Sequence, residues 1–238
     1  MVTTMRPAPM PEALLRAGDQ TSDPRTWKAT ARLLAAAHPH ARHDFAMSFT
    51  AAVVSAYWDA LQSKYAEPLP LLDIPDVAAD ASPIRLCPLD DISAALVRVI
   101  GRSAAGRDPI AAGYEIGDLY TMLLPDDFRA RRGVYYTPPA LARRLLALAT
   151  EAGVDWATCR VLDVACGGGA FITPVALAIA DALAPCPPET LLDHLSTHVQ
   201  GFEVDPFGAW LSQVLLDAAL VGAYRAGGRR LAPDDLLP

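Results

Sequence analysis

Cysteine is scarce in this sequence, with four residues among 238 and no Cys-x-x-Cys pair. Their spacing matches neither a zinc site nor a disulfide framework, so we interpret all four as free thiols. Histidine is sparse too, and only His194 and His198 are four residues apart, as two metal ligands on one helix face can be. No Glu follows His194, so the zinc motif His-Glu-x-x-His is absent. We therefore predict no metal site and interpret this pair as a solvated helix face.

Positive charge is also in short supply. The chain has 20 Lys and Arg against 27 Asp and Glu, which gives a net charge of -7. A protein that wraps nucleic acid by itself needs clustered basic side chains to neutralise the phosphates, and this balance argues against one. One basic group flanks a Tyr-Tyr-Thr-Pro segment and comprises Arg129, Arg131, Arg132, Arg143 and Arg144. It is either a local DNA contact or a set of helix-end charges that face water.

Long apolar runs are absent as well. None approaches the roughly 20 residues of a membrane-spanning helix. Residues 1–18 mix Arg, Glu and several prolines, unlike a secretory signal. We therefore expect a cytoplasmic protein without membrane contact. Hydrophobic residues nevertheless make up 52% of the sequence, enough for a globular core.

The first half of the chain has helical periodicity. Apolar residues recur at three- and four-residue steps over residues 24–65, where Pro39 divides two helices. Further helices are predicted at residues 89–101, capped by Asp90 or Asp91, and at residues 110–124. The proline-rich residues 67–88 predict a loop. Residues 1–128 are therefore predicted to form a helical module.

The second half changes to an alternation of strands and helices. A helix is predicted to start at Thr137-Pro138, and the following segments are a short buried strand at 160–165, a helix at 171–183, a strand at 199–204, a helix at 206–224 and a third strand opening at 230–231. Such an alternation predicts a parallel sheet with helices on its faces.

A glycine turn follows the first of these strands. Asp163 is near the strand's end, and Gly167, Gly168 and Gly169 lead into the next helix, so that bare backbone N–H groups line the carboxyl edge of the sheet. A dinucleotide-binding fingerprint would need a glycine where Ile172 stands, which disfavours that cofactor. Glu203, at the end of the second strand, can accept hydrogen bonds from both hydroxyls of a ribose. The pattern predicts a nucleoside-containing ligand.

These segments together resemble the amino-type DNA methyltransferases that act on adenine N6. The matching stretches lie between about residues 113 and 220 and read Gly117-Asp118-Leu119-Tyr120, Arg132-Gly133-Val134-Tyr135-Tyr136-Thr137-Pro138, Leu162-Asp163-Val164-Ala165-Cys166-Gly167-Gly168-Gly169-Ala170-Phe171 and Gly201-Phe202-Glu203-Val204-Asp205-Pro206. The resemblance implies an α/β fold, with a Rossmann-like, incomplete sheet of the S-adenosylmethionine-dependent methyltransferases over residues 129–238, preceded by the all-α module of residues 1–128.

The resemblance also implies a set of contacts to S-adenosyl-L-methionine. They are Tyr135, Tyr136, Thr137 and Pro138 at the methionine end, Asp163, Ala165, Gly167 and Gly169 around the amino acid moiety, Glu203 at the ribose, and Asp205 with Pro206 beside the adenine. The segment Pro233-Asp234-Asp235-Leu236-Leu237 is similar to the next family motif. It implies that Asp234, or Asp235 in the alternative register, faces the adenine amino group.

One family motif is missing. Family members grip the flipped-out adenine with a later Asn/Asp-Pro-Pro-Tyr/Phe loop, and no such tetrapeptide occurs here. We therefore assign no catalytic residue. In the family's sheet the first strand is central, so here it would present an unpaired apolar edge, which is an association hazard unless covered. We expect either a second polypeptide that completes the sheet and contacts DNA, or a longer enzyme of which these residues are a piece.

The favoured hypothesis is the cofactor-binding part of a site-specific adenine-N6 DNA methyltransferase, of the restriction-modification or phage-defence kind. Methyl transfer by direct attack would need no metal. One alternative is a catalytically silent subunit that binds S-adenosylmethionine for sensing or assembly. Another is a methyltransferase for RNA or a different substrate, which the Tyr-Tyr-Thr-Pro segment before the glycine turn disfavours.

Overall fold

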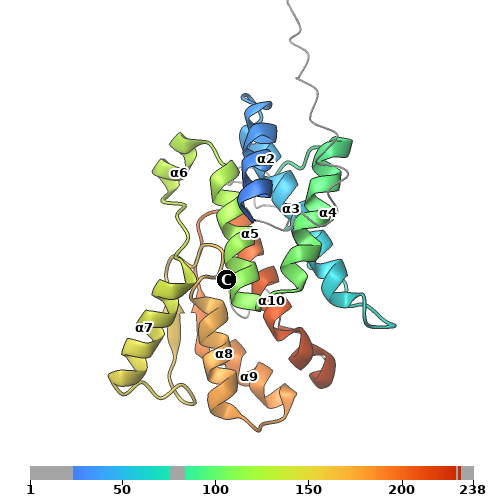
Figure 1. Ribbon diagram of the computed structural model, residues 1–238. Helices are drawn as coiled ribbons and strands as arrows, with labels where there is room; N and C mark the ends of the chain where they lie inside the picture. The colour runs from blue at the N-terminus through green and yellow to red at the C-terminus, as the bar shows by residue number, and fades with distance from the viewer. Residues whose placement is uncertain (1–23, 76–83, 229, 232–238) are drawn as a thin grey trace, which may run out of the picture.

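The computed structural model describes residues 24–75, 84–228 and 230–231 (Figure 1). Its elements are α2 (Pro24–Ala36), α3 (Arg42–Gln62), α4 (Asp91–Ala105), α5 (Pro109–Leu123), α6 (Asp126–Arg132), α7 (Pro139–Glu151), β1 (Val161–Asp163), α8 (Ile172–Leu183), α9 (Pro188–His198), β2 (Val199–Gly201) and α10 (Pro206–Gly227). Helices α2 to α5 lie together in the upper part of Figure 1, and α7 to α9 lie below them.

The helices predicted in the first half are confirmed. The turn around Pro39 separates α2 from α3, and residues 67–75 and 84–88 contain no helix or strand. Asp90 caps α4, because its carboxylate accepts a hydrogen bond from the Ser93 N–H at 2.7 Å. Gly101 lets α4 approach α3 closely, since a Cβ there would lie 2.6 Å from the Tyr57 backbone nitrogen. Large aromatic residues fill the space between these helices.

Helix α6 was not anticipated, and α9 was anticipated only at its C-terminal end. The segment of α6 has acidic residues in its first turn and arginines in its last, which suits the helix dipole. A helix face was expected at His194 and His198, whereas the start of α9 was not, because Pro188 stands in the first turn of the helix. A proline is tolerated there because its missing N–H would have had no partner inside the helix.

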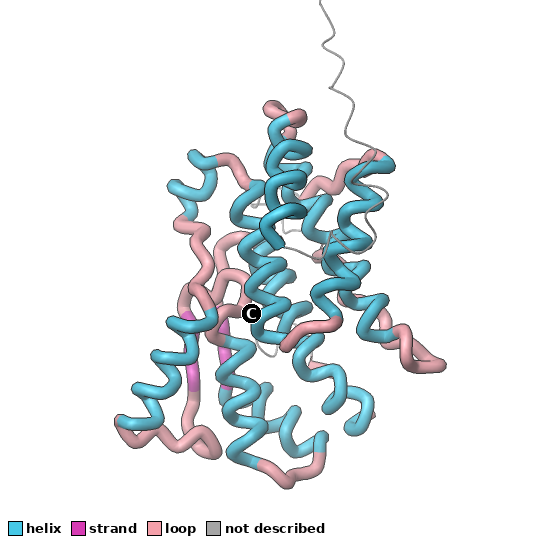
Figure 2. The backbone as a smooth tube through the Cα atoms, viewed as in Figure 1, coloured by secondary structure: helices cyan, strands magenta, loops and turns pink. Residues whose placement is uncertain are grey.

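The two strands pair in parallel, as predicted, with Val161 opposite Val199 and Asp163 opposite Gly201. Each is only three residues long, shorter than expected. The prediction that the first strand is buried is wrong in part: the Leu162 side chain is 55% exposed, because no described element covers that face. Arg230 and Leu231 belong to no strand among the residues that the structure describes. Figure 2 shows the strands in magenta, between α7 and α8 in this view.

Helix α10 belongs to both hydrophobic cores. Its first half, including Phe207 and Trp210, packs into the core of α2 to α5. Its second half, including Leu220 and Tyr224, packs against α8, α9 and β2. The cores are therefore not divided at the predicted boundary after residue 128. This double role explains why α10 alone among the described helices has the length and composition of a membrane span, although 72% of its apolar window is buried in the protein.

Candidate functional site

The carboxyl ends of β1 and β2 bring Asp163 and Glu203 to the same edge of the sheet. The Phe202 N–H donates to the Asp163 carbonyl at 2.8 Å, and the Cys166 N–H donates to the Phe202 carbonyl at 3.0 Å. These bonds continue the strand pairing into the glycine turn. The structure therefore places the turn between the two acidic side chains, as the alternation of strands and helices predicts.

The glycine turn needs glycine at particular positions. Gly167 and Gly169 have φ of 54° and 78°, a region that residues with a side chain rarely adopt. A Cβ on Gly169 would also lie 2.9 Å from the hydroxyl oxygen of Ser212 on α10. The buried Cys166 precedes these glycines, and burial raises the pKa of its thiol to about 12. That thiol stays protonated at neutral pH and is not activated as a nucleophile.

The ring of Tyr136 occupies a slot between three glycines. Cβ atoms built on Gly117 and Gly168 would each lie 2.5 Å from its ring atoms, and one on Gly167 would lie 2.8 Å away. We call these three residues the glycine slot. Gly117 lies on α5, so the slot joins the helical module to the turn. Burial, together with the nearby acids Asp205 and Glu203, raises the pKa of Tyr136, which keeps its phenol protonated.

The carboxylate of Glu203 is engaged by the backbone on both sides. One oxygen accepts from the Gly167 N–H at 2.9 Å, and the other accepts from the Asp205 N–H at 2.8 Å. These bonds hold the end of the second strand to the glycine turn. Because each carboxylate oxygen can accept two hydrogen bonds, one acceptor position on each remains.

Asp205 has an inward-facing role that the sequence did not predict. It is 7% exposed and caps α10, where its carboxylate accepts from the Phe207 N–H at 3.2 Å. The other carboxylate oxygen accepts from the Tyr120 hydroxyl of α5 at 2.8 Å. Burial and this carboxylate raise the pKa of Tyr120, so the phenol remains a donor. Asp205 thus links α5 to the strand end, and its expected place beside an adenine stays a prediction.

Asp163 keeps one carboxylate oxygen without a partner. Its Oδ1 accepts from the Ala165 N–H at 3.2 Å. Its Oδ2 is buried and has no hydrogen-bond partner among the described residues. A buried polar group in this condition costs about 1–3 kcal/mol, and more if it is charged. A ligand with a donor for this oxygen would remove that cost.

A cleft opens beside these residues. Its walls include Tyr135, Tyr136, Ala165, Gly167, Glu203 and Asp205, all predicted site residues, together with Arg132, Gly133, Val134, Val164 and Val204. Its volume is about 130 Å³, below the roughly 300–1,000 Å³ of ordinary ligand pockets. The cleft as it stands is therefore smaller than the pockets that usually hold a small-molecule ligand.

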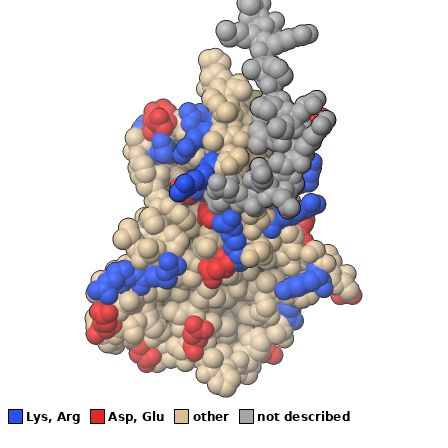
Figure 3. Space-filling model, in the orientation of Figure 1, with Lys and Arg blue, Asp and Glu red and all other residues tan. Residues whose placement is uncertain are grey.

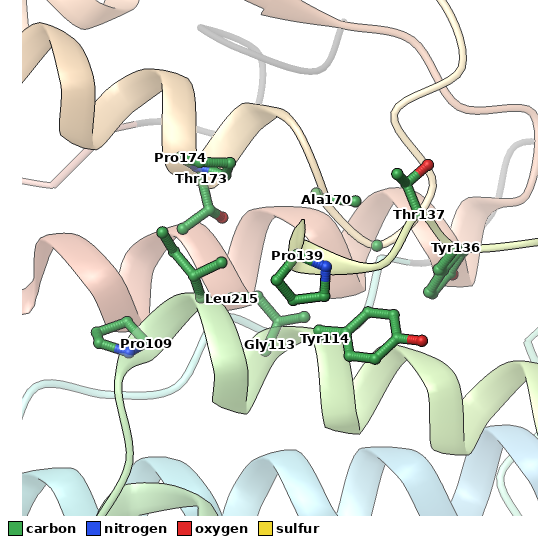
Figure 4. A pocket seen from close by; sticks show the side chains of 13 residues that line it. Pro109, Gly113, Tyr114, Tyr136, Thr137, Pro139, Ala170, Thr173, Pro174 and Leu215 are labelled. Carbon is green, nitrogen blue, oxygen red and sulfur yellow. The ribbon is translucent and has the colours of Figure 1, made fainter. Parts of the chain in front are cut away.

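A second, smaller cavity shares only Tyr136 with the cleft (Figure 4). It is lined by α5, the start of α7, the glycine turn, the start of α8 and α10, and contains about 20 Å³, enough for about one water molecule. Thr137 and Gly169 face this cavity, whereas Pro138 and Asp163 line neither space. Asp234 and Asp235 lie outside the described residues. The remaining predicted site residues are thus distributed on both sides of the Tyr136 ring.

Sequence reasoning assigned no site role to two contributions from α5. Gly117 forms part of the glycine slot, and the Tyr120 hydroxyl reaches Asp205. Their spacing of three residues places them on one face of α5, which is the signal that a sequence offers for a shared target. That target was not evident because both contacts depend on how α5 packs against the second half of the chain.

The arginines near the Tyr-Tyr-Thr-Pro segment are largely paired with acids. Arg129 pairs with Asp126, Arg131 with Asp127 and Arg144 with Glu151. Figure 3 shows basic and acidic atoms mixed at the upper left, where α6 lies. This pairing favours the interpretation as helix charges facing water, and only Arg132 of the group lines the cleft.

His194 and His198 stack face to face, with ring centroids 3.7 Å apart and planes 9° apart. Such rings do not converge on one point, as metal ligands do. Nδ1 of His198 lies 3.0 Å from the His194 carbonyl oxygen. Among the described residues, no three or more His, Cys, Asp and Glu side chains are grouped to hold a metal ion.

Comparison of the chain with protein-family models, with curated protein sequences and with solved structures found no match.

Proposed function

We propose that this chain binds S-adenosyl-L-methionine at the carboxyl edge of β1 and β2, as the cofactor-binding part of an adenine-N6 DNA methyltransferase of the restriction-modification or phage-defence kind. In this proposal the parallel strand pair belongs to an incomplete Rossmann-like methyltransferase sheet. The sequence resemblance supports the identity of the ligand, and the cleft supports its position.

The observation that carries the proposal is the unpartnered, buried Oδ2 of Asp163 beside the glycine turn. The ammonium group of the cofactor's methionine moiety is a donor of complementary charge for that oxygen. Glu203, at the end of the neighbouring strand, retains acceptor positions for the ribose hydroxyls. Once bound, the cofactor would supply an electrophilic methyl group.

Calorimetric titration of the purified chain with S-adenosylmethionine tests this proposal. We expect binding by the wild type and at least about a tenfold loss of affinity in Asp163→Asn and in Glu203→Gln, because each removes a charged acceptor. Asp59→Asn, at an exposed position on α3, is the matched control and should bind like the wild type. A cooperatively folded wild type that releases no heat at millimolar cofactor would contradict the proposal.

The absence of an Asn/Asp-Pro-Pro-Tyr/Phe tetrapeptide favours a second candidate, a silent subunit that binds the cofactor for sensing or assembly. The two candidates differ in methyl transfer. Cofactor binding without transfer of a labelled methyl group to adenine, even with proteins encoded nearby added, selects the silent subunit. Transfer to DNA upon such addition selects the methyltransferase.

A further inference from the structure

Two acidic side chains lie together between β2 and α10. Gly208, in the first turn of α10, leaves room for both, because a Cβ there would lie 3.2 Å from Cγ of Glu203 and 3.5 Å from Oδ2 of Asp205. Neither carboxylate forms an ion pair with any of the residues that the structure describes. Hydrogen-bond donors, rather than cations, therefore fix how the two side chains are oriented.

These donors form a continuous series from α5 to the glycine turn. Helix α5 packs against α10 (Figure 1), and its Tyr120 hydroxyl donates to Oδ2 of Asp205 at 2.8 Å. The Asp205 N–H donates to Oε1 of Glu203 at 2.8 Å. The Gly167 N–H donates to Oε2 of the same carboxylate at 2.9 Å. We call this series of three bonds the Tyr120 path.

Both oxygens of Asp205 are held, and one of the two donors comes from the helical module. The Tyr120 ring is fully buried and packs against Phe207, with ring centroids 4.8 Å apart, so its hydroxyl has a fixed position. The Phe207 N–H holds the other oxygen of Asp205. A side chain fixed at both oxygens also fixes its own backbone, including the N–H that faces Glu203. The orientation of Glu203 therefore depends on a residue of α5.

Helix α10 carries a second bond of the same kind, away from the site. The Tyr224 hydroxyl donates to Oδ1 of Asp217 at 2.9 Å, and both residues are buried. Asp217 is twelve residues beyond Asp205, roughly 18 Å along the helix at 1.5 Å per residue. Removal of the Tyr224 hydroxyl therefore has the same chemical effect as removal of the Tyr120 hydroxyl, but it leaves the Tyr120 path intact.

We propose that Tyr120 is a positioning residue for ligand recognition. Through Asp205 it holds the Glu203 carboxylate in the orientation in which its remaining acceptor positions bind the two hydroxyls of a ribose. The helical module thereby contributes to the specificity for ligands with a vicinal diol. The diol rests on the proposed function, whereas the effect of Tyr120 on the bond between Glu203 and Gly167 does not.

The first test compares S-adenosylmethionine with its 2′,3′-dideoxy analogue in calorimetric titrations of the full chain. We expect the wild type to bind the analogue at least about tenfold more weakly, because the hydrogen bonds to Glu203 are lost. Tyr120→Phe keeps the ring but removes the donor, and should reduce this preference to about threefold or less. Tyr224→Phe should keep the wild-type preference. A change in overall stability alone would leave the ratio of the two affinities unchanged.

The second test needs no ligand. Amide hydrogen exchange, resolved by NMR, is compared between Gly167 and Ile179, in the middle of α8. We expect Tyr120→Phe to speed exchange at Gly167 by at least about fivefold relative to Ile179, because the Glu203 carboxylate is held less well. Tyr224→Phe should leave this ratio unchanged. In an Asp205→Ala background, Tyr120→Phe should add little, since the path is already interrupted.

The two tests separate this inference from the proposed function. If the wild type prefers the diol and Tyr120→Phe keeps that preference, the proposal is overturned while the cofactor site stands. Equal effects of Tyr120→Phe and Tyr224→Phe would overturn it too, because the loss of any buried phenol would then act on the site. A wild type that binds neither ligand contradicts the proposed function and the role of the diol. In that case unchanged exchange at Gly167 in Tyr120→Phe would overturn the positioning role as well, and faster exchange would support it.

Discussion

The helical module and the strand pair bury their apolar residues to very different extents. In the module, Phe49 and Leu119 are fully buried, and Trp58 is 2% exposed. In the strand region, Leu162 of β1 and Val164, which follows it in the turn, are more than half exposed. Helix α10 contributes to both hydrophobic cores, so the difference does not come from that helix.

The two regions differ in how far described elements cover their apolar residues. A sequence such as Val161-Leu162-Asp163-Val164, apolar on both faces, is typical of a strand covered from both sides of a parallel sheet. Only one side of β1 is covered here. Among the described residues, the module therefore has a closed core, whereas one face of β1 is exposed.

Alanine substitutions at one leucine in each region test this difference in burial most directly. Leu119→Ala, in the module, is expected to lower the free energy of unfolding by about 2–5 kcal/mol, because it leaves a cavity. Leu162→Ala, on the exposed face of β1, is expected to change it by no more than about 0.5 kcal/mol, because the side chain is largely hydrated in the folded state. Urea denaturation monitored by circular dichroism gives both values.

The change in the free energy of unfolding for Leu162→Ala decides whether the two regions differ in solution. If Leu162→Ala cost as much as Leu119→Ala in a monomeric chain, the Leu162 side chain would be covered in solution, and the two regions would bury their apolar residues to the same extent. If both substitutions had small effects, the module would lack the tight core that its buried aromatic residues indicate.

The glycine slot connects the two regions, and Gly168→Ala tests that connection because it disturbs only the contact with the Tyr136 ring. The added Cβ would lie 2.5 Å from a ring atom of Tyr136. Gly168 has no positive φ, so the cost is steric alone and is expected to be about 1–3 kcal/mol in the free energy of unfolding.

A double-mutant cycle with Tyr136→Ala identifies the cause. If the clash with the ring is responsible, Gly168→Ala should cost much less once the ring is removed. Gly222→Ala, on α10, meets no atom within 4 Å and is expected to be neutral or to stabilise the chain by up to about 1 kcal/mol. Equal costs of Gly168→Ala with and without the ring would contradict the role of the slot.

The elements that local sequence specifies were predictable, and those that depend on tertiary packing were not. Asp163, the glycine turn and Glu203 were expected together, because parallel strands end at one edge of a sheet, and the structure joins Glu203 to Gly167. The insertion of Tyr136 against Gly117 was not, since it depends on where α5 packs. The start of α9 was missed because a proline in a first turn and a proline in a loop look alike in sequence.

The smallest expected effect concerns pH and the module alone. His43 is partly buried against Phe128, with ring centroids 4.3 Å apart, and its Nε2 is buried without a partner. Burial lowers the pKa of His43, against the opposing effects of Asp205 and Asp44. The folded state therefore disfavours the protonated ring, so the stability present above the unfolded pKa of about 6.5 is lost as the pH falls toward the folded pKa.

We expect His43→Gln to reduce the loss of stability on acidification between neutral pH and pH values below the folded pKa, measured by urea denaturation at each pH. His40→Gln, at an exposed position, controls for the removal of one imidazole. A pH dependence that is identical in wild type and His43→Gln would mean that the ring is as well hydrated in the folded chain as in the unfolded one, and that the module is less closed at this point than its other buried residues indicate.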